Sequence, residues 1–129
     1  MKILQINAVL NSGSTGTIVR DIGNLVEKTG HTALYAAPNA MPSEYEYRIG
    51  GMLDHKIHAF LCRVLGKQGY YSHFATFKLL KWIKKKKPDI VHLHNIHSNF
   101  LNYKMLFKYL ANNHIQTVIT LHDCWFFTG

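Results

Sequence analysis

The sequence predicts an α/β fold built on an open, doubly wound parallel sheet. Short β-rich runs alternate with longer segments whose apolar residues recur at helical spacing, which is the pattern of right-handed βαβ units. Two of the runs, Ile90–Leu93 and Val118–Leu121, are short and nearly all apolar, as strands covered on both faces are. Ligands bind to such sheets at the carboxyl ends of the strands, where the strand order reverses.

The first half of the chain contains three predicted strands and one helix. Lys2–Ala8 is a β-rich run that ends in a Gly/Ser/Thr turn. Thr17–Thr29 is a helix, and Gly30 stands where a helix end favours glycine. Thr32–Ala37 and Tyr45–Ile49 are the second and third strands. The apolar positions of the helix, at helical spacing, are Ile18, Ile22, Leu25 and Val26.

The second half contains three predicted helices and two strands. The helices are Leu53–Leu65, Ser72–Lys87 and Phe100–Asn112, and the strands are Ile90–His94 and Val118–Leu121. Each helix has an apolar side at helical spacing, and that of Phe100–Asn112 is expected to face inward. These sides are Ile57, Leu61, Val64 and Leu65; Phe74, Phe77, Leu80 and Ile83; and Tyr103, Leu106, Phe107 and Leu110.

Length and composition limit the class of protein. A chain of 129 residues has room for one domain, and with 47% hydrophobic and 17% charged residues it can bury a core. Two cysteines, Cys62 and Cys124, exclude a disulfide framework and a four-cysteine zinc site. No apolar run is long enough to span a membrane and no signal peptide precedes the fold, so we expect a cytoplasmic protein.

The net charge of +8 indicates an anionic partner. Six lysines lie on and beyond one predicted helix, on the side expected to be opposite its Phe74/Phe77/Leu80 stripe. They form either a solvated helix face or a surface for anionic lipid headgroups. Nucleic acid is not an expected partner, because no recognition helix, aromatic RNA-binding strand or zinc finger is present. The lysines are Lys78, Lys81, Lys84, Lys85, Lys86 and Lys87.

A turn rich in glycine, serine and threonine follows the first strand and leads into a helix. Its residues Gly13, Ser14, Thr15 and Gly16 would let backbone N–H groups approach a phosphate at a helix N-terminus. A flexible turn with Ser or Thr as N-cap accounts for the pattern equally well. The turn has no lysine for a Walker loop and too few glycines for a dinucleotide fingerprint, so an NAD-dependent enzyme is disfavoured.

Histidines cluster after the fourth and fifth strands. His92, His94 and His97 follow one another at the fourth, and three imidazoles can hold a catalytic zinc ion. The favoured interpretation is that His94 and Asn95 line a polar cleft, while His92 is hydrogen-bonded near the core.

After the fifth strand come His122, Asp123 and Trp125, which suit a sugar: polar groups for its hydroxyls and an aromatic face for its ring. An aromatic core plug with a capping Asp is the alternative. A thiol nucleophile at Cys124, two residues from His122, is disfavoured.

Three segments together resemble family 4 glycosyltransferases: Gly13–Ile18, Lys87–Asn95 and Thr120–Gly129. The resemblance spans residues 1–129 and concerns the N-terminal domain of that family. It implies a retaining enzyme of the GT-B fold, in which two Rossmann-like domains face each other across a cleft. Such an enzyme transfers a hexose from a nucleotide sugar to a glycan or lipid-linked acceptor.

The resemblance also implies roles for individual positions. His122 would face the transferred hexose as the catalytic residue, and Gly13, Ser14, Thr15 and Gly16 would approach the donor diphosphate, with Asp123 shaping the same cleft. No metal cofactor is implied, because helix N-termini and basic side chains stabilise the leaving diphosphate. The implied acceptor-side residues are His94, Asn95, Asn99 and Trp125.

The chain departs from the family in its length. The second, nucleotide-gripping domain is not in the sequence, and the first domain stops after its fifth strand, which would leave a sheet edge available for pairing with another copy. We therefore expect the isolated chain to be inactive. The alternatives are a non-catalytic module that binds a sugar or phosphate, and a metal-dependent hydrolase that uses His92, His94, His97 and His122.

Overall fold

The computed structural model of the chain describes residues 1–66 and 72–124. Within them, five parallel strands form one sheet: β1 (Lys2–Ile6), β2 (Thr32–Ala37), β3 (Glu46–Arg48), β4 (Ile90–Leu93) and β5 (Gln116–Ile119). Their order is β3-β2-β1-β4-β5, so the chain runs outward from β1 in one direction and then restarts on its other side at β4. The predicted doubly wound α/β fold is confirmed, and the strand order reverses between β1 and β4.

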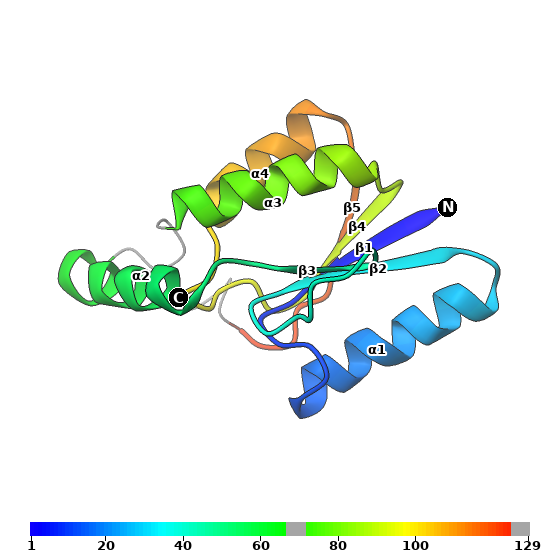
Figure 1. The fold of residues 1–129 in the computed structure, drawn as a ribbon, viewed down its shortest axis with the longest axis horizontal. Helices are drawn as coiled ribbons and strands as arrows, with labels where there is room; N and C mark the ends of the chain where they lie inside the picture. The colour runs from blue at the N-terminus through cyan, green and yellow to red at the C-terminus, as the bar shows by residue number, and fades with distance from the viewer. Residues whose placement is uncertain (67–71, 125–129) are drawn as a thin grey trace.

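Helices cover the two faces of the sheet unequally. Helix α1 (Gly13–Lys28) lies on one face, whereas α3 (His73–Lys86) and α4 (Tyr103–Asn112) lie side by side on the other (Figure 1). Helix α2 (Met52–Leu65) extends away from the sheet (Figure 1). No helix in the described part of the chain is both long enough and apolar enough to cross a bilayer.

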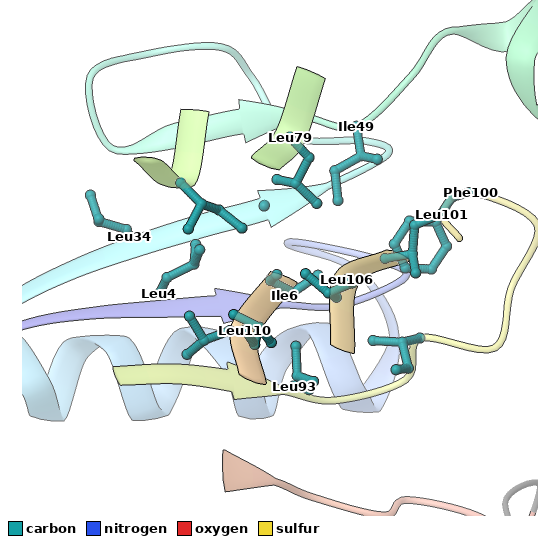
Figure 2. Packing of buried hydrophobic residues seen from close by; sticks show 14 residues of the cluster. Leu4, Ile6, Leu34, Ile49, Leu79, Leu93, Phe100, Leu101, Leu106 and Leu110 are labelled. Atoms are coloured by element: carbon teal, nitrogen blue, oxygen red, sulfur yellow. The ribbon is translucent and has the colours of Figure 1, made fainter. Parts of the chain in front are cut away.

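Side-chain alternation along β1 builds the two layers of the interior. Leu4 and Ile6 point toward α3 and α4, where they meet Leu79 and Leu106 in the larger apolar cluster (Figure 2). Gln5, between them, points toward α1 and donates a hydrogen bond to a carbonyl of that helix. A smaller cluster on the α1 side joins the helix to β2, through Val19, Val26, Ala33 and Tyr35.

Helix α1 begins earlier than the sequence predicts, and its larger apolar side chains do not all face inward. It begins at Gly13 rather than Thr17, so the glycine-rich turn forms the first turn of the helix. Of the apolar residues at helical spacing, Ile18 and Leu25 are exposed, and the buried positions are Gly16, Val19, Gly23 and Val26. Gly23 allows this rotation because, without a Cβ atom, it brings the helix backbone close to Tyr35 of β2.

Helix α3 is also rotated relative to the prediction. Phe74 and Phe77 are 63% and 48% exposed, and smaller side chains, Ala75 and Thr76, are buried instead. Thr76 explains the preference, because its hydroxyl accepts a 2.8 Å hydrogen bond from the backbone N–H of Asn102, at the start of α4. The prediction that the lysines lie opposite the aromatic stripe is therefore wrong for both phenylalanines.

The apolar side of α2 is not buried, and one further prediction about burial is wrong. On α2, Ile57, Val64 and Leu65 are exposed, whereas His58 is buried. In β5, which was expected to be covered on both faces, all four residues are exposed. Among residues 1–66 and 72–124 this strand lies at the edge of the sheet, as predicted, and pairs with β4 alone.

Gly23 provides a test of how closely α1 approaches the sheet. A Cβ atom at this position would lie 1.8 Å from the hydroxyl oxygen of Tyr35, whose ring is buried and carries the Arg20 guanidinium 4.3 Å from its centroid. We expect Gly23→Ala to lower the free energy of unfolding by about 1–3 kcal/mol, the usual cost of overpacking. Thermal and denaturant melts measure the change.

Gly16→Ala is the matched control in the same helix. Its Cβ would make only ordinary contacts, 3.4 Å or more from the neighbouring atoms. Alanine is also the better helix former, by about 1 kcal/mol in a helix interior. Stability of Gly16→Ala should equal or exceed that of the parent, and an equal loss in both variants would contradict the close approach at Gly23.

Candidate active site

Polar side chains gather where β1, β4 and β5 end. His94 follows β4 directly, and its backbone N–H donates to the carbonyl of Ile6 at 2.9 Å. Thr120 follows β5 in the same way, and donates to the carbonyl of Leu93. These bonds extend the sheet by one residue on each strand. They bring residues from three neighbouring strands together at the carboxyl end of the sheet, here called the site edge, beside the point where the strand order reverses.

Three imidazoles form a stack at this edge. The ring centroids of His92 and His94 are 4.1 Å apart, and those of His94 and His122 are 5.3 Å apart. Nδ1 of His94 lies 3.1 Å from Nε2 of His122, and Nε2 of His92 lies 2.7 Å from the Thr120 hydroxyl. The prediction that His92 is hydrogen-bonded near the core is confirmed, because its ring is half-buried and has this partner.

His94 is held in its neutral form. Its residue is 1% exposed, and burial, together with the neighbouring His92 and His122, lowers its pKa to about 3. Burial and the nearby His122 also lower the pKa of His92. Two neutral rings therefore lie at the base of the stack, and His122 is the outermost ring, only half-buried.

Two amide side chains, which the sequence analysis missed, hold this edge together. Gln5 accepts from His94 Nε2 at 3.2 Å, and Asn7, which is 1% exposed, accepts from the backbone N–H of Asn95 at 3.1 Å. The amide of Asn7 also donates to the carbonyl of Val9 at 2.8 Å. The signal was present in the sequence, because Gln5 and Asn7 are polar residues within an apolar strand run.

The glycine-rich turn is fixed to the same edge. Asn39, also missed, both donates to and accepts from the backbone of Leu10 at 2.7 Å, which clamps the chain ahead of α1. Thr15 lies 3.4 Å from the Asn7 amide, so the first turn of α1 contacts the end of β1. Gly13 has a φ of +66° and open space around it. Ser12 stands at the N-cap without a side-chain capping bond, so the structure gives no support to the N-cap explanation of this turn.

The remaining predicted site residues are placed differently. Oδ2 of Asp123 lies 2.7 Å from Nε2 of His97, and this hydrogen bond joins the segments after β4 and β5. Asn99 lines a separate hollow with Ala59 and Arg63 of α2. Its Oδ1 atom is buried and has no hydrogen-bond partner within residues 1–66 and 72–124. Trp125 lies outside the described residues.

The structure gives no support to the metal-site interpretation. Across the residues that are described, no three His, Cys, Asp or Glu side chains form a group that could hold a metal ion. The rings of His92, His94 and His122 stack on one another instead of converging on a point. Their nitrogens also face Thr120, Gln5 and one another.

The low pKa of His94 predicts a dependence of stability on pH. Below pH 6.5, the ordinary pKa of histidine, His94 binds a proton in the unfolded chain. In the folded chain it stays unprotonated until about pH 3, so protonation favours unfolding. The free energy of unfolding should fall as pH falls from 6.5, with a contribution from His94 of up to about 1.4 kcal/mol per pH unit. Denaturant melts at a series of pH values measure this slope.

The variant His94→Asn isolates the contribution. Its slope between about pH 6 and pH 4 should be shallower than that of the parent, because no proton uptake remains at this position. His114→Asn is the control, since His114 is exposed and has a φ of +51° that asparagine tolerates. Parallel slopes for the parent and His94→Asn would show that His94 titrates normally.

Comparison with known proteins identifies the family. The family model described as glycosyltransferase family 4 matches residues 15–129, which include the glycine-rich turn from Thr15 onward and both histidine segments. The curated proteins contain no match to the chain. Because the matched range covers far more than half of the sequence, the family resemblance is confirmed. The chain therefore belongs to glycosyltransferase family 4, and residues 15–129 correspond to its N-terminal domain.

Proposed function

We propose that this chain forms one wall of the active site of a retaining hexosyltransferase. The donor is a nucleotide sugar, and the acceptor is a glycan or a lipid-linked glycan. One observation carries the proposal: the first turn of α1 and the His122 ring both lie at the carboxyl end of the sheet. They are joined through Asn7, Asn95 and His94. A phosphate group and a sugar ring of one donor molecule need that combination of a helix N-terminus and polar side chains.

The N-terminus of α1 suits the donor diphosphate. The helix has 16 residues and no acidic side chain in its first turn, so its partial positive charge is not neutralised there. Gly13 and the exposed Ser14 leave the backbone of that turn open to an anion. In the proposed enzyme these groups stabilise the leaving diphosphate, and no metal cofactor is required.

His122 is the proposed catalytic residue, and faces the transferred hexose. Its ring is the outermost of the stack and only half-buried, so a ligand can reach it. Asp123 follows it and is proposed to shape the same cleft. Asn95, Asn99 and Trp125 are proposed to contact the acceptor. His94, which the resemblance also implies there, is 1% exposed and has both ring nitrogens in hydrogen bonds, so it is not part of this proposal. A second domain is proposed to complete the cleft, so that the 129 residues alone turn over no donor.

A charge placed in the first turn of α1 tests the donor site. We expect Ser14→Asp to weaken binding of nucleotide diphosphate sugars by at least about tenfold, through repulsion of the diphosphate. The same change should leave the helix as stable as before or more so, because an acid at a helix N-terminus is favourable. Calorimetric titration with a panel of donors and a thermal melt measure the two effects.

Ser14→Asn is the matched neutral control and should bind the donors as the parent does. Equal donor affinity of the Asp and Asn variants would contradict the proposed position of the diphosphate at this turn. Release of free nucleotide from the same panel of donors measures turnover. Turnover by the 129 residues alone would contradict the proposed need for a second domain.

A second surface supports action at the inner face of a membrane, in the cytoplasm. Phe74 and Phe77 are exposed on α3, and Lys78 and Lys81 lie over their rings, 4.3 and 4.7 Å from the ring centroids. Lys84 and Lys85 extend this face and are also exposed, as is Lys87 just beyond the helix, whereas Lys86 is half-buried near Trp82. Exposed aromatic side chains and lysines on one helix are typical of helices that bind at a membrane interface. The acceptor of the proposed enzyme would be held in that membrane.

Liposome sedimentation tests this surface. The chain should pellet with vesicles rich in acidic phospholipid at low salt, and Lys78→Glu/Lys81→Glu should abolish pelleting, because each lysine near an anionic surface contributes about 1 kcal/mol. Lys28→Glu/Arg48→Glu changes the net charge equally at exposed positions outside α3, and should still pellet. Equal loss in both variants would indicate attraction by net charge alone, and no pelleting of the parent would exclude the membrane surface.

A further inference from the structure

A chain of hydrogen bonds runs from the middle of α1 to the outermost ring of the histidine stack. It begins at the carbonyl oxygen of Val19, which accepts from the Gln5 side-chain nitrogen at 2.9 Å. The Gln5 side-chain oxygen lies 3.2 Å from Nε2 of His94. Nδ1 of His94 lies 3.1 Å from Nε2 of His122. Four groups from α1, β1 and the ends of β4 and β5 are thus connected in one line.

The first member of the chain sets the direction of every other bond. A backbone carbonyl oxygen only accepts, so Gln5 must present its NH₂ group to Val19 and its oxygen to His94. An amide oxygen also only accepts, so the proton of His94 stands on Nε2.

His94 therefore has a lone pair on Nδ1, provided that its ring carries a single proton. Burial supports this condition, because the His94 residue is 1% exposed and its pKa is lowered to about 3. A lone pair on Nδ1 of His94 requires a donor opposite it, and the atom opposite is Nε2 of His122. That nitrogen must carry a proton.

We propose that Gln5 and His94 are positioning residues that hold His122 in the Nε2-protonated tautomer, with a lone pair on Nδ1. Neutral imidazole otherwise distributes its proton between both nitrogens, and a single partner selects one of them. Neither positioning residue needs to contact a ligand, because both nitrogens of His94 are engaged within the chain.

The proposed tautomer determines what His122 recognises. A lone pair on Nδ1 accepts a hydrogen bond from a ligand hydroxyl and opposes a phosphate oxygen, which also accepts. Within the proposed function, on which this step rests, His122 would meet a hydroxyl of the hexose, while the diphosphate stays at the first turn of α1. Gln5 and His94 would thereby fix the orientation of the donor.

Nitrogen NMR of the full chain, labelled with ¹⁵N at histidine and free of ligand, tests the proposal. The chain has nine histidines, and the spectrum of His122→Asn identifies the resonances of His122 by their loss. The spectra are recorded at about pH 8.5, two pH units above the ordinary imidazole pKa, so that tautomers can be assigned. His122 should show a protonated, pyrrole-type Nε2 and an unprotonated, pyridine-type Nδ1.

Two variants interrupt the chain at different points. Gln5→Met removes the acceptor for His94 Nε2–H, and His94→Phe keeps a stacked ring but removes the acceptor for His122. In either variant the two nitrogen resonances of His122 should move toward each other, as expected for a mixture of tautomers. Thr120→Val is the matched control: it removes the hydroxyl bonded to His92 at the same edge, and should leave the His122 resonances in place.

The outcomes are distinct. A pyrrole-type Nδ1 in the parent, or an unchanged single tautomer in whichever of the two variants retains a dispersed spectrum, would overturn the proposal. An equal shift in Thr120→Val would indicate a general loosening of the edge and would overturn it as well. If the chain bound no nucleotide sugar but His122 showed the proposed tautomer, the proposed function would be contradicted. The positioning roles of Gln5 and His94 would still stand.

Discussion

The burial of two amide side chains in and just after β1 is the constraint on which the rest of the site depends. Gln5 and Asn7 lie in the middle of the sheet, each 1% exposed, where an amide without partners costs about 1–3 kcal/mol. Their partners come from α1, from the loop before it and from the segment after β4. Satisfying the two amides therefore fixes the helix, the glycine-rich turn and the first histidine relative to one another.

Hydrogen bonds also position the imidazole rings, which lie beside β4, beyond the strands that α1 covers. Helix α1 covers β1 and β2, whereas β5 is exposed along its length. The rings of His92 and His94 are held there by Thr120 and Gln5, from either side of β4. Hydrogen bonds thus fix the positions of these side chains, as apolar packing does elsewhere in the sheet.

The sequence was sufficient for the fold class and for the approximate position of each strand, because strand runs and helix spacing are local patterns. The last strand is the exception in detail, since β5 begins at Gln116 rather than at the predicted Val118. The sequence was insufficient for the faces of the helices, because the deciding residues were small. Gly23 leaves room for the Tyr35 side chain, and the Thr76 hydroxyl accepts a hydrogen bond from the backbone of Asn102. Helices α1 and α3 therefore turn these small residues inward, and Leu25, Phe74 and Phe77 are exposed. Hydrophobicity alone assigns the opposite rotation. For the site, the histidines were found from their strand ends, but Gln5, Asn7 and Asn39 were missed because their roles depend on partners distant in sequence.

The central position of β1 has a consequence for how the chain folds during synthesis. Its first partner follows α1 directly, since Ile3 pairs with Ala33, and this βαβ unit already encloses the smaller apolar cluster. Its second partner comes much later, because the same Ile3 pairs with Ile90. The larger cluster needs Val91 and Leu93 of β4 as well as both helices of its layer, so it cannot close until most of the chain has left the ribosome. One flank of β1 remains open for that interval, and pairings so distant in sequence form slowly.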